Sequence, residues 1–233
     1  MNTDFELLKS EPFILFLTIG AYYIGTQIQK SVHNPLVNPL LIALLIIIPT
    51  LLALDIDYPT YEKGSHAISL LLSPTVVALG FALHKQIKHL KGNVTRVLLA
   101  ITAGSIVGVL SVVAVCMILG TPEILMVSME PKSVTMPIAL GITERTGGLA
   151  PLTAITVFVC GIFGNIVGPW FMKLIGIKSP IAQGLALGAA SHGVGTARAM
   201  QLGQLQGAVA GMAIGLMGIW TAVVVPIVQA VLK

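Results

Sequence analysis

The chain has 233 residues, of which only 9% are Asp, Glu, Lys or Arg and 55% are hydrophobic. Soluble domains carry roughly 25% charged residues, and a mean hydropathy of +0.94 excludes an ordinary soluble fold. The formal net charge of +4 comes from short stretches between apolar runs, so it gives no reason to expect a nucleic-acid partner. Cys116 and Cys160 both lie inside apolar runs, which predicts small core residues rather than a disulfide.

Uncharged stretches of membrane length divide the chain. They are residues 12–29, 31–54, 64–84, 97–122, 146–172 and 179–197. Each approaches the ~20 residues that a helix needs to cross a ~30 Å hydrocarbon core. Their continuous Leu, Ile, Ala and Gly content favours helices over the alternating ~10-residue strands of a barrel. We predict an all-α integral membrane protein, a polytopic helical bundle of about 6–8 membrane segments forming a single domain over residues 1–233.

The predicted helices, in chain order, cover residues 12–29, 37–54, 64–83, 94–119, 147–172 and 205–231. Residues 55–62 are expected to form an acidic loop, and Pro74 is expected to break the third helix. The stretches 84–96 and 173–178 are basic. The positive-inside rule places them in the cytoplasm and the acidic loop outside. The expected location is the cell (inner) membrane, crossed several times.

Two further segments, 124–145 and 182–201, have membrane length but contain Gly or Pro and a charge near their middle. Irregular backbone at membrane depth must be buried in protein or line a cavity. The sequence leaves open whether these are re-entrant hairpins or discontinuous spanning helices, and the orientation of the flanking helices favours hairpins. Paired broken elements are typical of midplane binding sites in secondary transporters and are compatible with an inverted repeat.

The second broken segment contains a candidate anion site. Residues 179–232 hold one charged residue, Arg198, and a charge at membrane depth is by default a functional candidate. Gly193 and Gly195 permit a break, so the next half-helix would begin here and expose N–H groups that attract anions. Arg198 would supply a planar fork for a carboxylate. The expected binding residues of this segment are Ser191, His192, Gly193, Thr196 and Arg198.

The first broken segment has a similar construction. Pro131 suits the first turn of a helix, and this helix start would gather N–H groups around Lys132, Ser133 and Thr135. Both segments thus offer a helix N-terminus and a cation. This pairing predicts that the ligand is a small anion, in particular a carboxylate.

Structural roles compete with these assignments. Lys132 and Arg198 could reach an interface or cap a neighbouring helix, and His192 could be packed and neutral. Glu130 and Glu144 are candidate coupling carboxylates, which loop positions explain equally well. Three glycines at spacings of three and four predict close helix packing, namely Gly161, Gly164 and Gly168. Because the sequence shows no Ser/His/Asp set, metal cluster or phosphate loop, we expect no enzyme, metal or cofactor.

Several motifs spread over almost the whole chain carry a family resemblance. They are NPLLIA (38–43), LSPTVVALG (72–80), EPKSVTMPIA (130–139), CGIFGNIVGP (160–169) and ASHGVGTARAM (190–200). Together they resemble the LrgB/CidB family of bacterial membrane proteins. The family is named for a proposed role in controlling murein hydrolase export and lysis, as a holin/antiholin-like pair with a small LrgA/CidA-type membrane partner. A plastid relative that fuses both types carries glycolate and glycerate, and bacterial relatives are linked to pyruvate and similar acids.

The resemblance implies a substrate site, which would comprise Lys132, Ser133, Thr135, His192, Gly193, Thr196 and Arg198. It also implies a separately encoded small partner, because this chain lacks the small half of the plastid fusion. Two functions are therefore expected to compete. The first is a secondary transporter of small monocarboxylates, with proton coupling left open. The alternative is a holin/antiholin-like regulator of lysis. The lipid bilayer surrounds either, and homo-oligomers are expected from the glycine-rich faces.

Overall fold

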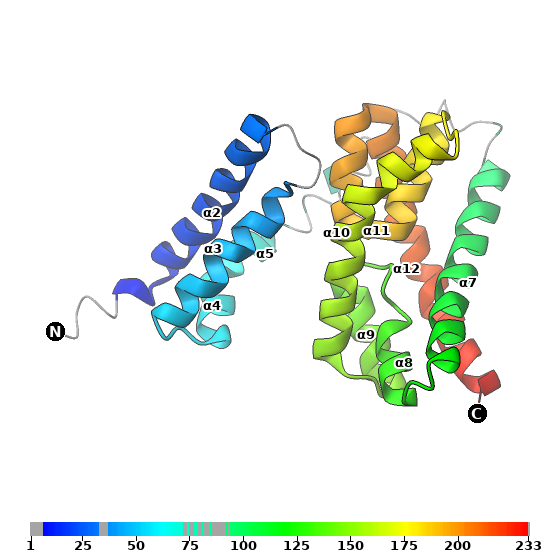
Figure 1. Ribbon diagram of the computed structural model, residues 1–233, viewed down its shortest axis with the longest axis horizontal. Helices are drawn as coiled ribbons and strands as arrows, with labels where there is room; N and C mark the ends of the chain where they lie inside the picture. The colour runs from blue at the N-terminus through cyan, green and yellow to red at the C-terminus, as the bar shows by residue number, and fades with distance from the viewer. Residues whose placement is uncertain are drawn as a thin grey trace. The chain divides into compact units, whose positions relative to one another are not determined.

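Every regular element that the structure describes is a helix (Figure 1). The computed structural model describes residues 7–32, 37–71 and 94–232, together with residues 74, 77, 78, 81, 84 and 92. The chain forms two compact units, residues 1–77 and 78–233, each with its own buried clusters. The all-α fold is confirmed, and the expectation of one membrane domain over residues 1–233 stays a prediction.

The first unit is an antiparallel helix pair followed by two short helices. Its elements are α2 (Glu11–Val32), α3 (Pro39–Ala53), α4 (Tyr58–Gly64) and α5 (His66–Leu70). The pair packs through small and apolar side chains, Ala21 on α2 and Ala43 and Ile47 on α3. The side chain of Asn38 accepts a hydrogen bond from the Leu40 N–H (2.8 Å) and so caps the start of α3.

Two expectations for this unit change. Residues 55–62 are not only a loop, because Asp57 accepts a hydrogen bond from the Thr60 N–H (3.3 Å) and caps α4 there. The signal was present in the sequence, since an Asp followed directly by Tyr58 and Pro59 is a typical helix start. The predicted helix 64–83 begins as α5. Beyond residue 71 most of that segment lies outside the described residues, so the expected break at Pro74 stays a prediction.

The second unit contains helices long and apolar enough to cross a membrane. They are α7 (Val94–Ile118), α10 (Ala150–Leu174) and α12 (Gln204–Leu232). α7 and α12 run in the same direction, because Ser105 lies beside Thr221 (Oγ to Oγ1, 3.2 Å) and Val113 lies in the cluster that Val228 covers. α10 runs in the opposite direction (Figure 1). The chain is thus a multi-pass membrane protein.

The first broken segment is a re-entrant hairpin formed by α8 (Glu123–Met129), a turn at 130–135, and α9 (Met136–Thr146). α9 runs alongside α12 in the same direction, since Ile138 packs on Gly218 while Arg145 lies nearer Pro226. It therefore returns toward the end of the unit where α7 stops. This corrects the expected helix start at Pro131. Pro131 lies in the turn, and α9 begins after Thr135 with Pro137 in its first turn.

The second broken segment is also a hairpin. α11 (Pro180–Leu202) is interrupted at Ser191 and His192, the latter with φ 41°. Gly195 packs directly against the backbone of Leu187, although eight residues of continuous helix would separate them by about 12 Å. The break therefore precedes the expected glycines by a few residues. The segment 182–201 thus enters and turns back, which agrees with the hairpin that the orientation of the flanking helices favoured.

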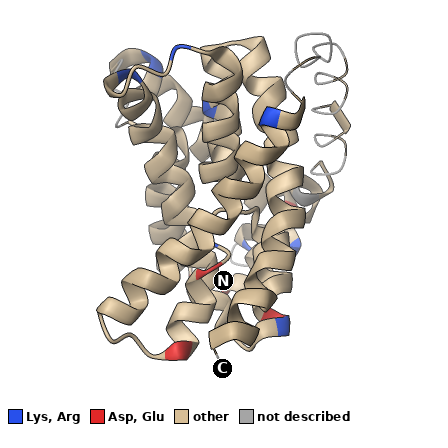
Figure 2. Cartoon of the chain, turned by 90° about the vertical axis from the view of Figure 1, so that its right-hand side faces the viewer, with Lys and Arg blue, Asp and Glu red and all other residues tan. Residues whose placement is uncertain are grey.

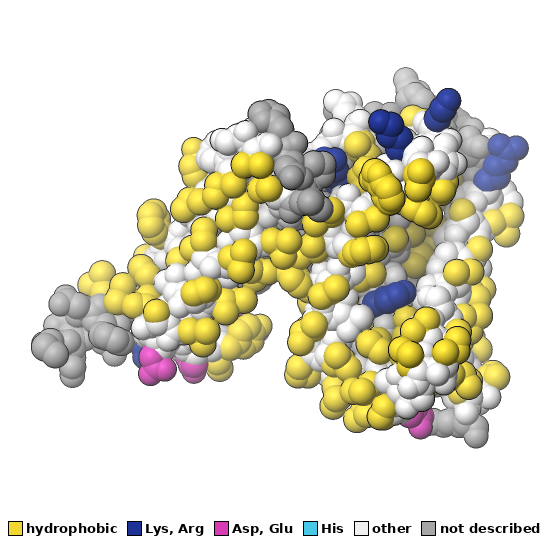
Figure 3. Space-filling model, viewed as in Figure 1, with side chains coloured by type: hydrophobic (Ala, Val, Ile, Leu, Met, Phe, Trp, Pro, Cys, Tyr) yellow, Lys and Arg dark blue, Asp and Glu magenta, His cyan; other side chains and the backbone are white. Residues whose placement is uncertain are grey.

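An inverted pattern relates the two halves of this unit. α7 and α10 are each 25 residues long, run in opposite directions, and are each followed by a hairpin. The hairpins enter from opposite ends, in agreement with the expected inverted repeat. Lys and Arg side chains gather at one end of the unit and an acidic one lies at the other (Figure 3). In the ribbon of Figure 2 most basic positions lie at the first end, and one lies beside an acidic position at the second. Arg96 at the start of α7 shares the basic end with Lys173 and Lys178. Residues 85–91 and 93 of the first basic stretch lie outside the described residues, and the cytoplasmic location of this end stays a prediction.

Candidate functional site

A cavity of about 520 Å³ lies where the two hairpins approach each other. Its walls are one face of α7 between Ala100 and Gly108, and the entering limb of α11 between Ala182 and Ala190. The turn of the first hairpin and Cys160 of α10 complete it. Gly108 and Cys160 both lie near the middle of 25-residue helices, so the cavity is at mid-depth in the unit. In Figure 3 a basic side chain lies in a hollow of this unit, away from the basic end.

Among the described residues that line this cavity, Lys132 is the only charged one. Its Nζ donates to the carbonyl oxygen of Gly108 (3.1 Å), and no described carboxylate lies within ion-pair distance of it. The local backbone fixes its position, because the Lys132 N–H donates to Met129 (3.2 Å) and the Val134 N–H donates to Pro131 (3.3 Å). The cation is therefore held at mid-depth by a tight turn, with unused hydrogen-bonding capacity.

Within the described part of the chain, Ser133 and Cys160 are the other polar residues that line the cavity. The Cys160 thiol donates to the carbonyl oxygen of Ala190 (3.4 Å), next to the break in α11. Cys160 thus lies between the two hairpins, a position that the expectation of a small core residue missed. Only its neighbourhood in the CGIFGNIVGP motif pointed toward it.

The turn of the second hairpin is a buried polar cluster against α10. His192 Nε2 donates to the carbonyl oxygen of Val157 (3.0 Å), and the Thr196 hydroxyl donates to the carbonyl oxygen of His192 (3.0 Å). Ser191 is fully buried, and its hydroxyl has no partner among the described residues. Asn165, which was not predicted, donates to the carbonyl oxygen of Val194 (2.9 Å) and so ties α10 to the start of the returning limb.

The α10 glycines make room for this turn. A side chain at Gly161 would meet the His192 ring, one at Gly164 would meet the Ser191 hydroxyl, and one at Gly168 would meet Leu187. The prediction that these glycines serve close packing is confirmed.

The other predicted residues lie apart from the cavity. Arg198 lies on the returning limb of α11 and donates through Nη1 to Gln201 Oε1 (2.7 Å). Thr135 caps α9 by position but makes no side-chain cap bond. The structure brings Lys132 and Ser133 together, and it groups Ser191, His192 and Thr196 elsewhere. Arg198, Thr135 and Gly193 do not line the cavity.

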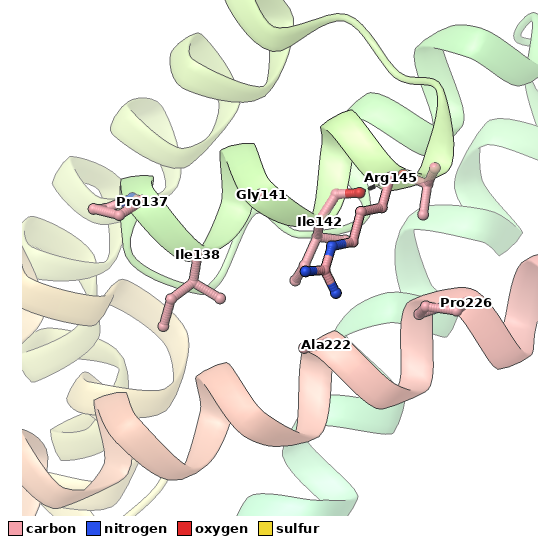
Figure 4. Close-up of a pocket in the computed structure, with 8 residues that line it drawn as sticks. Pro137, Ile138, Gly141, Ile142, Arg145, Ala222 and Pro226 are labelled. Atoms are coloured by element: carbon pink, nitrogen blue, oxygen red, sulfur yellow. Dashed lines mark hydrogen bonds between the residues drawn. The ribbon is translucent and has the colours of Figure 1, made fainter.

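A second groove of about 250 Å³ runs between α9 and α12 (Figure 4). Its lining is mostly apolar, and Arg145 extends into it from α9 toward Ala222 (Figure 4). Arg145 is exposed and stands in the last turn of α9, where a cation favours the helix dipole. This structural role accounts for it without a ligand.

Glu130 occupies an unexpected environment for a loop residue. It is 1% exposed, its Oε2 accepts a hydrogen bond from Gln229 Nε2 (2.9 Å), and its Oε1 has no partner among the described residues. Glu144, the other carboxylate considered for coupling, is exposed at the end of α9. The two glutamates of the first hairpin are thus clearly distinguished by burial.

Comparison with known proteins places the chain in a family. The model of the LrgB-like family matches residues 18–231. Holin-like protein CidB of Staphylococcus epidermidis is 33% identical over 95% of this chain and 96% of its own length. Antiholin-like protein LrgB of Bacillus cereus is 35% identical over 92% and 94%, and uncharacterized protein YxaC of Bacillus subtilis is 34% identical over 82% and 84%. No solved structure shows a significant match. The chain therefore belongs to the LrgB-like family of membrane proteins.

Proposed function

We propose that this protein carries small monocarboxylates across the membrane as a secondary transporter. The observation that supports the proposal best is Lys132, a cation without a carboxylate partner among the described residues, held in a mid-depth cavity between two opposed hairpins. Keeping a lysine at membrane depth costs at least ~2.5–3.5 kcal/mol on insertion scales. An anionic substrate that pairs with Lys132 would offset that cost.

The cavity chemistry supports a small monovalent acid. One ammonium group and the Ser133 hydroxyl match one carboxylate and an adjacent oxygen, as in glycolate, glycerate, lactate or pyruvate. The remaining walls are Ala, Gly, Val, Leu, Ile and the Cys160 thiol, which suit a short carbon chain. A binding cavity with one cation and apolar walls gives a dicarboxylate no second positive partner.

The second hairpin has a supporting part in this proposal. Its entering limb forms one wall of the cavity, and Ser191, His192 and Thr196 brace its turn against α10. A direct role in binding for Thr135, Ser191, His192, Gly193, Thr196 and Arg198 stays a prediction. We further propose that a small LrgA/CidA-type membrane protein assembles with this chain, and that the chain is not an enzyme.

A second candidate function is a holin/antiholin-like regulator of murein hydrolase export and lysis. The names of the relatives favour it more directly than they favour transport, since one is called holin-like and another antiholin-like. Such a protein would act by oligomerising in the membrane and would need no substrate. It leaves the placement of Lys132 in the mid-depth cavity without a role.

Uptake into liposomes separates the two candidates. The full chain would be reconstituted with and without its small partner, and saturable uptake of labelled glycolate, glycerate, lactate and pyruvate would be followed beside release of a trapped dye. Saturable uptake without dye release is expected, with a loss in Lys132→Ala and none in Lys178→Ala, an exposed lysine at the basic end. Dye release without saturable uptake would reject the transporter and support the lysis regulator. Saturable uptake that Lys132→Ala leaves intact would reject the site.

A further inference from the structure

The turn of the first hairpin holds a carboxyl group as well as a cation. Glu130 and Lys132 lie on the same tight turn, joined by the bond from the Lys132 N–H to Met129. Lys132 reaches the cavity, whereas Glu130 is buried beside the last turns of α12, where Gln229 donates to one of its two oxygens. Any movement of this turn therefore shifts the proposed anion site and the buried carboxyl together.

The surroundings of Glu130 are apolar. The neighbouring cluster contains Val112, Val113, Cys116 and Met126, with Met129 and Val228 packed on it. Gln229 is an uncharged donor, and Glu130 Oε1 has no partner in the described part of the chain. An ionised carboxylate needs several donors or a counter-ion when it is buried in this way. The neutral acid needs only one acceptor and one donor and fits these surroundings better.

The packed elements supply no fixed counter-charge to Glu130. Within the described residues, the titratable and charged side chains of these elements are Arg96 and Cys116 of α7, Glu123 of α8, Glu144 and Arg145 of α9, and Cys160 and Lys173 of α10. None of them makes a hydrogen bond or ion pair with Glu130. α12 contributes Gln229 and no titratable group within Gln204–Leu232. Lys132, two residues along the same turn, points its Nζ to the Gly108 carbonyl oxygen instead. Among the described residues, Glu130 therefore has no paired cation, and a proton is the counter-charge that we consider.

We propose that Glu130 is the proton-binding group of this protein and that it couples carboxylate movement to a proton gradient; this inference rests on the proposed transport function. With a proton on Glu130, the turn is stable in its buried position. When Glu130 is ionised, burial becomes unfavourable and the turn moves, carrying Lys132 with it. The turn of the first hairpin thus has two positions, buried and displaced. Binding of the proton to Glu130 and of the anion to Lys132 both change the balance between these positions. One proton and one monocarboxylate would move together, so each cycle would transfer no net charge.

The test uses Glu130→Gln in the full chain with its small partner, in liposomes with an imposed pH gradient. Glu144→Gln is the matched control, an exposed glutamate on the same hairpin. We expect wild type and Glu144→Gln to accumulate substrate in response to the gradient. Glu130→Gln is expected to accumulate about tenfold less substrate than wild type, or less still. It should still exchange external labelled for internal unlabelled substrate. Exchange involves no net proton movement, so it reports transport independently of coupling.

Each other outcome is decisive. No transport by wild type in either assay would reject the proposed function itself. Wild-type transport that ignores the pH gradient, or gradient-driven accumulation that Glu130→Gln retains, would overturn the role of Glu130 and leave transport standing. Loss of exchange together with accumulation, in a monodisperse variant, would make Glu130 a binding residue and also overturn the coupling role.

Calorimetry covers the case in which Glu130→Gln fails to fold. Substrate binding to the wild-type complex would be measured in two buffers with different ionisation enthalpies, which gives the number of protons taken up. We expect proton uptake that rises with pH, from little where free Glu130 is already protonated toward about one proton per bound anion where it is ionised. Glu130→Asp, whose shorter side chain sits differently toward Gln229, should shift this pH dependence. No proton uptake by wild type at any pH would reject the proposal.

Discussion

The two hairpins share a shape but differ in how each is closed. The first has a turn of several residues between two separate helices, and α8 is tied to the start of α10, where the Ser128 hydroxyl accepts from the Leu149 N–H (2.7 Å). The second is a kinked helix whose break is confined to Ser191 and His192 and whose limbs touch at Gly195. The chemistry follows the same division, because Lys132 and Glu130 lie in the longer turn of the first hairpin. The comparison indicates that the second hairpin is the rigid wall and the first is the working part.

Gly195→Ala is expected to have the largest effect on the second hairpin. The new methyl group would overlap the backbone of Leu187, and the limbs would have to separate. Overpacking of this kind costs about 1–3 kcal/mol or more. Thermal unfolding of the purified protein in detergent would measure the loss. Gly193→Ala is the control, since a side chain there meets only open space. Equal stability of the two variants would contradict the tight closure of this hairpin.

The two cations test which hairpin carries the substrate. Removing Lys132 breaks a charge-assisted pair worth about 1.5–3 kcal/mol, so Lys132→Ala should lower uptake efficiency by at least about tenfold. Arg198 is already bonded to Gln201 outside the cavity, so Arg198→Ala should lower it by only about two- to threefold. The measurement is the concentration dependence of uptake in liposomes. A larger loss in Arg198→Ala would reverse the assignment and support the sequence-based site on the second hairpin.

The thiols report access to the space between the hairpins. Cys160 lines the cavity, whereas Cys116 is buried in the α7 cluster. A negatively charged thiol reagent should modify Cys160 in a Cys116→Ala background and leave Cys116 unmodified in Cys160→Ala. Adding Lys132→Ala should slow the anionic reagent several-fold more than a neutral one, because the attraction of the ammonium group is lost. Mass spectrometry gives both rates, and equal slowing would show that Lys132 does not attract anions in this cavity.

Ser191→Ala should have the smallest effect on stability and uptake. It tests whether the second hairpin has a structural role only. The hydroxyl is buried without a partner among the described residues, so its removal should leave stability unchanged or raise it by up to about 1 kcal/mol. Uptake should stay within about twofold of wild type, since Ser191 does not line the cavity. A marked loss of uptake with normal stability would instead place Ser191 in the substrate site, as its sequence context had predicted.

The helices that follow from local composition could be predicted from the sequence. The features that depend on contacts between distant residues could not. Uncharged runs located α7, α10 and α12, and the charges and glycines at 124–145 and 182–201 located both broken segments. The break at His192 was placed a few residues late, because glycines mark where backbone freedom exists, whereas the break is fixed by the bond to Val157. The burial of Glu130 depends on Gln229, 99 residues away in the chain. No local pattern carries that information.

The return of each hairpin to the end it entered has a consequence for mapping the topology with reporter fusions. If both hairpins crossed the membrane, the loop at 147–149 and the loop at 175–179 would each change sides, because α10 would be inverted. The two changes cancel before α12, so a reporter fused at the C-terminus would give the same answer for either arrangement. Only a reporter placed between α9 and α10, or between α10 and α11, distinguishes them. A correct C-terminal location is therefore no proof of a correct count of membrane crossings in this protein.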